Sequence, residues 1–153
     1  MLRPIRFIMG RIIVHTHGRP REKAYSHLVE IYSSRLEARG VKLIQHSEKL
    51  SHDNYIKKLE SLSEDSQLIL LEESGKTGTS DWFLSLWKKW KLNTSNIHLA
   101  IGPVDGFENS VSDKHESLSL SPLTMTYEMA AVVLLEQLYR VSELERGSPY
   151  HRE

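Results

Sequence analysis

QLILLEESGKTGTSDWFLSLWKKWKLNTSNIHLAIG, at residues 67–102, carries the clearest evidence for the fold class. It opens with an apolar run of strand length, Gln67–Leu71, and closes with another, Ile97–Ile101. Between the two runs, residues 81–92 place four large apolar side chains on one face of a helix: Phe83, Leu86, Trp87 and Trp90. We interpret the tryptophans as core residues rather than as platforms for base stacking. A strand–helix–strand unit with apolar strands is typical of an α/β domain with a mainly parallel sheet.

The rest of the chain repeats this alternation of strands and helices. Further strands are expected at Arg11–Thr16, at Val41–Gln45 and around Leu118 and Leu120, and further helices at Arg21–Arg39, at 52–62 and at Thr126–Glu145. Between the third strand and its helix, Glu72–Ser80 is expected to be a loop in which Ser80 caps the helix. Beside the short fifth strand, we expect Ser117, Ser119 and Ser121 to alternate outward.

Length and composition indicate one small domain from a reducing compartment. No repeat or linker is visible in the 153 residues, so we predict a single domain at 11–153 with an extension at 1–10. The absence of cysteine excludes disulfides, thiolate zinc sites and a cysteine nucleophile. No apolar run approaches the roughly 18 residues of a membrane span, and the charged start does not resemble a signal peptide. We therefore expect a cytoplasmic protein that contacts no membrane.

The charge pattern gives only a weak indication of a nucleic-acid partner. Lys and Arg number 20, and Asp and Glu also number 20, so the formal net charge is zero. Residues 1–46 nevertheless hold 9 basic and 3 acidic side chains, a net of +6, which leaves 11 against 17, or −6, for the remainder. A basic N-terminal third suits a phosphate backbone, although a solvated helix face explains the same pattern.

Three loops leave the carboxyl ends of expected strands, where ligands of open parallel sheets bind. They are Leu71–Lys76, Ile101–Phe107 and Leu120–Met125. Glycines in the first two allow the backbone to approach a ligand closely, and the third is apolar with small hydroxyls, as an adenine slot requires. None matches a Walker loop or a dinucleotide-binding fingerprint, so ordinary turns remain an alternative.

The eight histidines form no metal-binding motif. His15 and His17 would point the same way from a strand, but spacing supplies no third ligand. We expect no metal site.

At these loops the sequence resembles a known family, the SPOUT-type methyltransferases that modify N3 of a pseudouridine in large-subunit ribosomal RNA. The resemblance extends from about Gly10 to the C-terminus. It rests on Leu70–Lys76, on Gly102 and on Asp105-Gly106. Its most specific matches are EQLYR at 136–140 and the ending RGSPYHRE at 146–153.

The resemblance implies an α/β fold with a C-terminal trefoil knot, which would be one of the rare knotted proteins. It implies an enzyme that uses S-adenosylmethionine to methylate 23S ribosomal RNA in the ribosome, and that acts as a homodimer. The cofactor would lie in the knot, held by these residues: Leu71, Gly102, Gly106, Leu120, Ser121, Pro122, Leu123, Thr124 and Met125.

The resemblance also implies catalytic roles near the C-terminus. His151 would take the N3 proton, Arg140 and Arg152 would hold phosphate or steady a developing anion, and Tyr150 would stack on a base. Simpler explanations remain open. Arg140 would alternatively pair with Glu136 at i−4, and the tail would alternatively be frayed. The last helix is apolar on more than one face, which favours burial in a dimer interface.

Three positions depart from the family pattern. Pro103 replaces a usual glycine and removes a backbone donor, while Tyr127 and Ala131 replace a usual His and Arg. These departures motivate a second hypothesis, an RNA-binding or ribosome-assembly protein of the SPOUT fold with lost or reduced methyl transfer. A third is an unrelated small α/β nucleotide-binding module.

Overall fold

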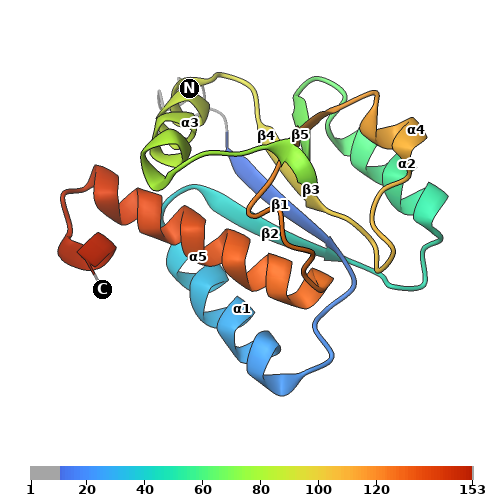
Figure 1. Cartoon of the computed structure of the whole chain (residues 1–153), viewed down its shortest axis with the longest axis horizontal. Helices are drawn as coiled ribbons and strands as arrows, with labels where there is room; N and C mark the ends of the chain where they lie inside the picture. The colour runs from blue at the N-terminus through green and yellow to red at the C-terminus, as the bar shows by residue number, and fades with distance from the viewer. Residues whose placement is uncertain (1–10, 153) are drawn as a thin grey trace, which may run out of the picture.

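The computed structural model describes residues 11–152, with side chains as far as Tyr150, so the predicted extension at 1–10 lies outside the described residues. Five parallel strands form one sheet in the order β2-β1-β4-β3-β5 (Figure 1). The strands are β1 (Ile12–His17), β2 (Val41–His46), β3 (Gln67–Lys76), β4 (Ile97–Ile101) and β5 (Glu116–Leu118). The helices are α1 (Lys23–Glu37), α2 (His52–Leu62), α3 (Ser80–Leu92), α4 (Asn109–Ser112), α5 (Tyr127–Glu145) and the 3-10 turn η2 (Pro149–Arg152). The predicted α/β class is confirmed, and the trefoil knot stays a prediction of the family resemblance.

The helices divide between the two faces of the sheet according to the direction in which the chain moves. The connections from β1 to β2 and from β3 to β4 run toward one edge and place α1 and α3 on the same face as α5 (Figure 1). Those from β2 to β3 and from β4 to β5 run the other way and place α2 and α4 on the opposite face. Crossovers between parallel strands nearly always have the same hand, so connections that run in opposite directions place their helices on opposite faces.

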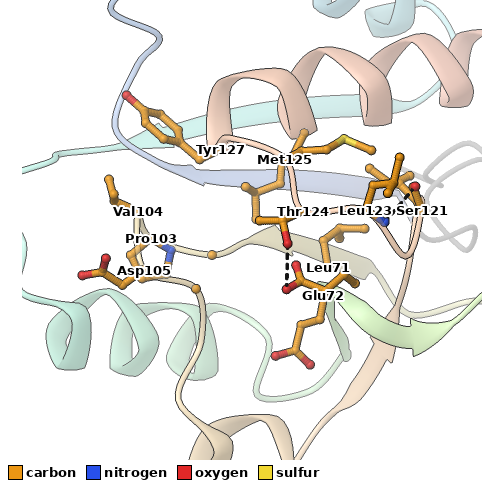
Figure 2. A pocket seen from close by; sticks show the side chains of 16 residues that line it. Leu71, Glu72, Pro103, Val104, Asp105, Ser121, Leu123, Thr124, Met125 and Tyr127 are labelled. Carbon is orange, nitrogen blue, oxygen red and sulfur yellow. Dashed lines mark hydrogen bonds between the residues drawn. The ribbon is translucent and has the colours of Figure 1, made fainter.

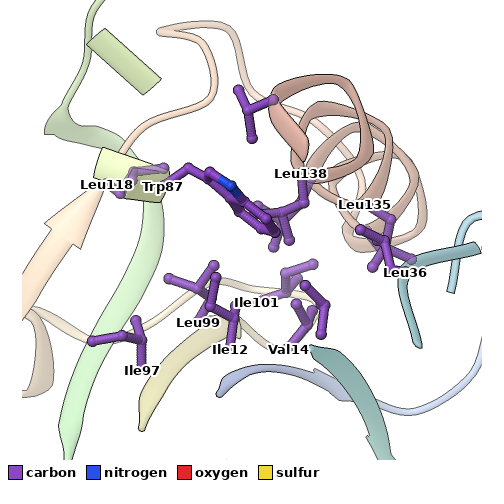
Figure 3. Close-up of a cluster of buried hydrophobic side chains, with 14 of the residues drawn as sticks. Ile12, Val14, Leu36, Trp87, Ile97, Leu99, Ile101, Leu118, Leu135 and Leu138 are labelled. Atoms are coloured by element: carbon purple, nitrogen blue, oxygen red, sulfur yellow. The ribbon is translucent and has the colours of Figure 1, made fainter. Parts of the chain in front are cut away.

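The main core lies between the sheet and the helices α1, α3 and α5. Because side chains alternate along a strand, Ile97, Leu99 and Ile101 of β4 all point into it. Trp87 of α3 fills the space between these strand residues and Leu138 of α5 (Figure 3). Trp87 is 1% exposed, which confirms the interpretation of the tryptophan face as core. Truncating such a side chain to alanine costs about 3–5 kcal/mol.

The opposite face carries a hydrogen-bonded row of three buried histidines, which the sequence did not reveal. His15 Nδ1 lies 2.8 Å from His46 Nε2, and His15 Nε2 lies 2.8 Å from His98 Nδ1. The rings are stacked and lie under α2, whose Tyr55 meets His46 edge-on. His17 shares this face and stacks on Tyr55, so the prediction that His15 and His17 point the same way is confirmed.

The described part of the chain holds neither a metal-binding cluster nor a membrane span. No three His, Asp or Glu side chains there gather in a way that would hold a metal ion. No described helix is both long enough and apolar enough to cross a bilayer.

The expected loop at 72–80 is wrong in its first half, because β3 continues to Lys76. After a register shift, Lys76 pairs again with Leu118 of β5. Gly75 makes this second pairing possible, since a Cβ there would lie 2.7 Å from the Leu118 backbone nitrogen. The extension matters for the site because it carries the acidic residues Glu72 and Glu73 along an ordered strand.

Smaller differences between the predictions and the structure concern the cap of α3, the burial of Ser119 and the short helices. Thr79, not Ser80, caps α3, and its side chain accepts a hydrogen bond from the Trp82 backbone. Ser119 does not face outward; it is buried, and its hydroxyl donates to the Ser121 carbonyl. The short helix α4 and the 3-10 turn η2 were not predicted, whereas α1, α2, α3 and α5 lie within two residues of their expected ends.

Candidate cofactor pocket

A cavity opens at the carboxyl ends of β3, β4 and β5, where the three loops singled out in the sequence converge (Figure 2). Its volume is about 210 Å³, far above the roughly 10–15 Å³ that one water needs, so it suits a small organic ligand. The loops contribute these lining residues: Leu71, Glu72, Glu73, Ile101, Gly102, Pro103, Val104, Asp105, Gly106, Leu120, Ser121, Leu123, Thr124 and Met125. Tyr127 and Ala130 of α5 complete the wall.

The structure therefore brings together all but one of the proposed cofactor residues. Pro122 is the exception: it lies outside the lining and is exposed. Its neighbours are held by a local turn, in which the Leu123 backbone donates to the Ser121 hydroxyl.

The loop after β4 is a tight turn in which two glycines have different tasks. The Gly106 N–H donates to the Pro103 carbonyl at 2.7 Å, and Gly106 has a φ of +77°, which favours glycine. No atom lies within 4 Å of where a Gly106 Cβ would stand, so its α-carbon faces open space beside the pocket. A Cβ on Gly102 would instead crowd Phe107 at 3.2 Å. Gly102 thus allows the turn to pack against Phe107, and Gly106 leaves space beside the pocket.

Pro103 does not disrupt this turn. It supplies the carbonyl that closes the turn, and it is buried at the base of the pocket. The residue removes one backbone donor from the pocket wall, as the sequence suggested, but leaves the wall itself in place.

Carboxylates give the pocket a negative rim. Glu72 accepts a hydrogen bond from Ser112 of α4, and Glu73 accepts one from Thr124 at 3.4 Å (Figure 2). Asp105 and Glu73 are exposed. Apolar side chains alternate with these acids, and two of them are left open: Val104 is 74% exposed and Leu123 is 75% exposed. The pocket therefore combines apolar walls with acids that favour a cationic ligand.

The other two positions that depart from the family pattern, Tyr127 and Ala131, lie in different surroundings. Tyr127 lines the pocket, and its hydroxyl donates to the Arg19 carbonyl at 3.1 Å. Burial raises the pKa of Tyr127, so it remains a neutral phenol. Ala131 points into the core, where it is 3% exposed.

Of the proposed catalytic residues of the C-terminus, Arg140 and Tyr150 do not line the pocket of the same chain. Arg140 donates to Glu136 at 2.8 Å, as the simpler explanation had it, and Tyr150 donates to the same carboxylate oxygen at 3.1 Å. The Tyr150 ring also meets the Tyr139 ring edge-on. The tail therefore docks on its own α5 and is not frayed at Tyr150. The side chains of His151 and Arg152 lie outside the described residues.

Comparison with known proteins agrees with the fold and shows the family of the chain. A family model described as "Predicted SPOUT methyltransferase" matches residues 10–151. The chain belongs to the SPOUT methyltransferases. The resemblance seen in the sequence motifs is thereby confirmed, and the hypothesis of an unrelated nucleotide-binding module is wrong.

Relatives of this SPOUT methyltransferase cover nearly its whole length. "Ribosomal RNA large subunit methyltransferase H" of Prochlorococcus marinus (strain NATL1A) is 35% identical over 89% of this chain and 92% of its own. The protein of the same name from a second strain of Prochlorococcus marinus is 36% identical over 100% of both chains. A solved structure described as "Structural insights into the 2-OH methylation of C/U34 on tRNA" shares the fold, with a TM-score of 0.50 at 12% identity over 88% of this chain and 97% of its own.

Proposed function

We propose that this protein is an S-adenosylmethionine-dependent methyltransferase of large-subunit ribosomal RNA, with N3 of a pseudouridine as the acceptor, and that it works in the cytoplasm. The observation that carries the proposal is the convergence of three loops on one pocket in a chain whose full-length relatives bear the name of a ribosomal RNA methyltransferase. The pocket supports a cofactor at that place, and the names of the relatives support the substrate.

The residues of the pocket suit the three chemically different parts of the cofactor. The apolar side chains of Leu71, Leu120 and Met125 offer a slot for an adenine ring. Glu73 and Asp105 would attract an ammonium or a sulfonium. The free space beside Gly106 allows backbone to approach the ligand closely.

The chain itself would contribute binding and orientation rather than covalent chemistry. The cofactor, when bound, supplies a methyl group on a sulfonium, which is a good leaving group. The pocket wall would hold that group toward the mouth of the pocket, so that an acceptor nitrogen can approach in line. An acceptor nitrogen that took this methyl group would release its N3 proton, so the site would also need a base.

The base and the cationic groups would come from a second copy of the chain. Tyr127 at the pocket and Arg140 are 13 residues apart on α5, which is about 20 Å along a helix. Arg140 of one chain is thus too far from its own pocket to touch an acceptor there, and Tyr150, which is bonded to Glu136, does not line that pocket either. We therefore propose a two-fold homodimer in which the C-terminal tail of each chain, with Tyr150, His151 and Arg152, serves the pocket of the other.

The face of α5 left for such a partner is narrower than its sequence indicated. Most of its apolar residues, such as Leu134, Leu135 and Leu138, are already buried within the chain. Met129, which is 38% exposed, and the partly exposed Val133 and Arg140 form the remaining stripe. Sedimentation at tens of micromolar protein tests the proposal; a monomer at that concentration would contradict it.

Calorimetry with S-adenosylmethionine separates the proposed enzyme from an RNA-binding protein of the same fold. We expect saturable binding at micromolar to millimolar ligand. Gly106→Val is the matched negative control, because its side chain would fill the free space at the pocket. Absence of binding at millimolar ligand, with ribosome binding retained, would favour the assembly-protein hypothesis.

A further inference from the structure

The loop between β1 and α1, residues Gly18–Glu22, is held against the mouth of the pocket and exposes two arginines. We call it the arginine loop. It follows β1, whose neighbour β4 leads into the Pro103–Gly106 turn of the pocket wall. Figure 2 shows Tyr127, a pocket residue, beside the segment that leaves β1. Arg19 and Arg21 are both exposed.

The first turn of α5 fixes the backbone of this loop. Tyr127 donates its hydroxyl hydrogen to the Arg19 carbonyl, while the backbone N–H groups of Arg21 and Glu22 donate to Glu128 Oε2 at 2.7 and 3.2 Å. These partners are 106 to 108 residues apart in the chain. Binding residues are often carried by exposed loops that a rigid scaffold holds in position, and these bonds hold the arginine loop in that way.

The other end of the loop is fixed as well. Gly18 has a φ of +101°, its N–H donates to the His46 carbonyl at 2.8 Å, and its carbonyl accepts from Thr16 at 2.8 Å. The loop is therefore held at both ends, one by the sheet and one by α5.

Both arginine side chains are exposed on a loop that contacts the pocket residue Tyr127. The guanidinium of Arg21 lies near enough to the Tyr127 hydroxyl to lower its pKa, against the larger effect of burial, which raises it. Glu128 Oε2 accepts hydrogen bonds from the loop amides, and within the described residues no salt bridge joins Arg19 or Arg21 to a carboxylate. Arginine forks match phosphate geometry, and no pocket residue is cationic.

We propose that the arginine loop, positioned by Tyr127 and Glu128, grips the phosphate backbone of the RNA substrate beside the nucleotide that enters the pocket. This inference rests on the proposed function and names the part of the same site that holds the substrate. Tyr127 and Glu128 are positioning residues, and Arg19 and Arg21 contact the RNA. In this proposal, two of the basic side chains in the N-terminal third, Arg19 and Arg21, bind phosphate.

Steady-state methylation of unmodified ribosomes tests the proposal. Combining Arg19→Ala with Arg21→Ala should raise the KM for ribosomes at least tenfold, with kcat and S-adenosylmethionine affinity within twofold of the wild type. The salt dependence of ribosome binding should become shallower by about 0.7–0.9 in log–log slope for each lost phosphate contact. Lys88→Ala is the matched control, because it removes an exposed cation near the end of α3 farthest from the pocket.

A second pair of variants tests whether Glu128 positions the arginine loop. Glu128→Ala removes the acceptor for two loop amides and should raise the KM as the arginine variants do, whereas Glu128→Gln keeps an acceptor oxygen and should restore a KM near the wild type. An arginine double variant with an unchanged KM and salt slope, or a Lys88→Ala variant with an equal rise, would overturn the proposal. If the wild type transfers no methyl group, the proposed function fails, and the salt slope of ribosome binding alone still decides the role of the loop.

Discussion

Lowering the pH from 7 to 5 should destabilise the fold through the row of buried histidines. Burial, and then the neighbouring His98 and His46, lower the pKa of His15 from 6.5 to about 3. Burial is also the main cause that lowers the pKa of His46 and of His98. All three rings are therefore neutral in the folded protein, whereas they take up protons near pH 6.5 once the chain unfolds.

The sign and size of the effect follow from proton linkage. A histidine with a lowered pKa favours folding fully above pH 6.5, and that contribution is lost as the pH falls from 6.5 toward 3. For His15, each pH unit in this window costs about 1.4 kcal/mol. His15 alone thus removes about 2 kcal/mol between pH 6.5 and pH 5, and the other two add to it. A domain of this size has about 5–15 kcal/mol of stability in total, so the loss should be easy to measure.

Urea unfolding followed by circular dichroism, at one protein concentration and at pH 7, 6 and 5, measures this loss. His15→Gln cannot titrate but keeps a donor and an acceptor, so its stability should fall by about 2 kcal/mol less than that of the wild type over the same range. His27→Gln, at an exposed position of α1, is the matched control and should behave as the wild type. Equal stability of the wild type at pH 7 and pH 5, or an identical pH dependence for His15→Gln, would refute the reasoning.

Three further predictions concern the pocket, the sheet edge and the tail. Gly106→Val should weaken S-adenosylmethionine binding at least tenfold, about 1.4 kcal/mol, in calorimetry; Gly147→Val, which places the same strain at a φ of +77° away from the pocket, should not. Gly75→Ala should destabilise the protein by about 1–3 kcal/mol in urea unfolding, because its Cβ would meet the Leu118 backbone and unpair the end of β3; a urea midpoint equal to that of the wild type would contradict this. Removal of residues 149–153 should leave cofactor binding intact and lower methyl transfer to ribosomes at least a hundredfold, and full activity would show that the tail plays no part.

The parallel sheet could be predicted because its signal is local. Apolar runs such as Ile97–Ile101 and the helical spacing of Phe83, Trp87 and Trp90 are visible within a few residues. The position of the pocket followed from a general rule, that ligands bind beyond the carboxyl ends of parallel strands. The loops named on that basis do line one cavity.

What could not be predicted depends on contacts between distant parts of the chain. The histidine row joins residues 15, 46 and 98, which become neighbours only through the order and register of β2, β1 and β4. The continuation of β3 to Lys76 depends on pairing with β5 more than 40 residues later, through a register shift that a single sequence does not reveal. The hydrogen bond from Arg21 of the arginine loop to Glu128 joins residues that are 107 apart, so it could not be predicted either.

The docking of the tail shows the limit of motif reasoning. The segments 136–140 and 146–153 carried the most specific resemblance, and they suggested catalytic roles for Arg140 and Tyr150. Within one chain, both groups instead bind the carboxylate of Glu136. The motif predicts which residues matter, but where they act depends on the proposed dimer.

A single methyl-transfer measurement, on ribosomes that lack the modification, decides whether this protein is the proposed enzyme. Purified protein is incubated with radiolabelled S-adenosylmethionine and these ribosomes, and the methylated nucleotide is located by mass spectrometry of large-subunit RNA fragments. We predict close to one methyl group per ribosome, on N3 of a pseudouridine, and its loss in the variant without residues 149–153. No methyl transfer by a protein that binds the cofactor and the ribosome would contradict the proposed activity.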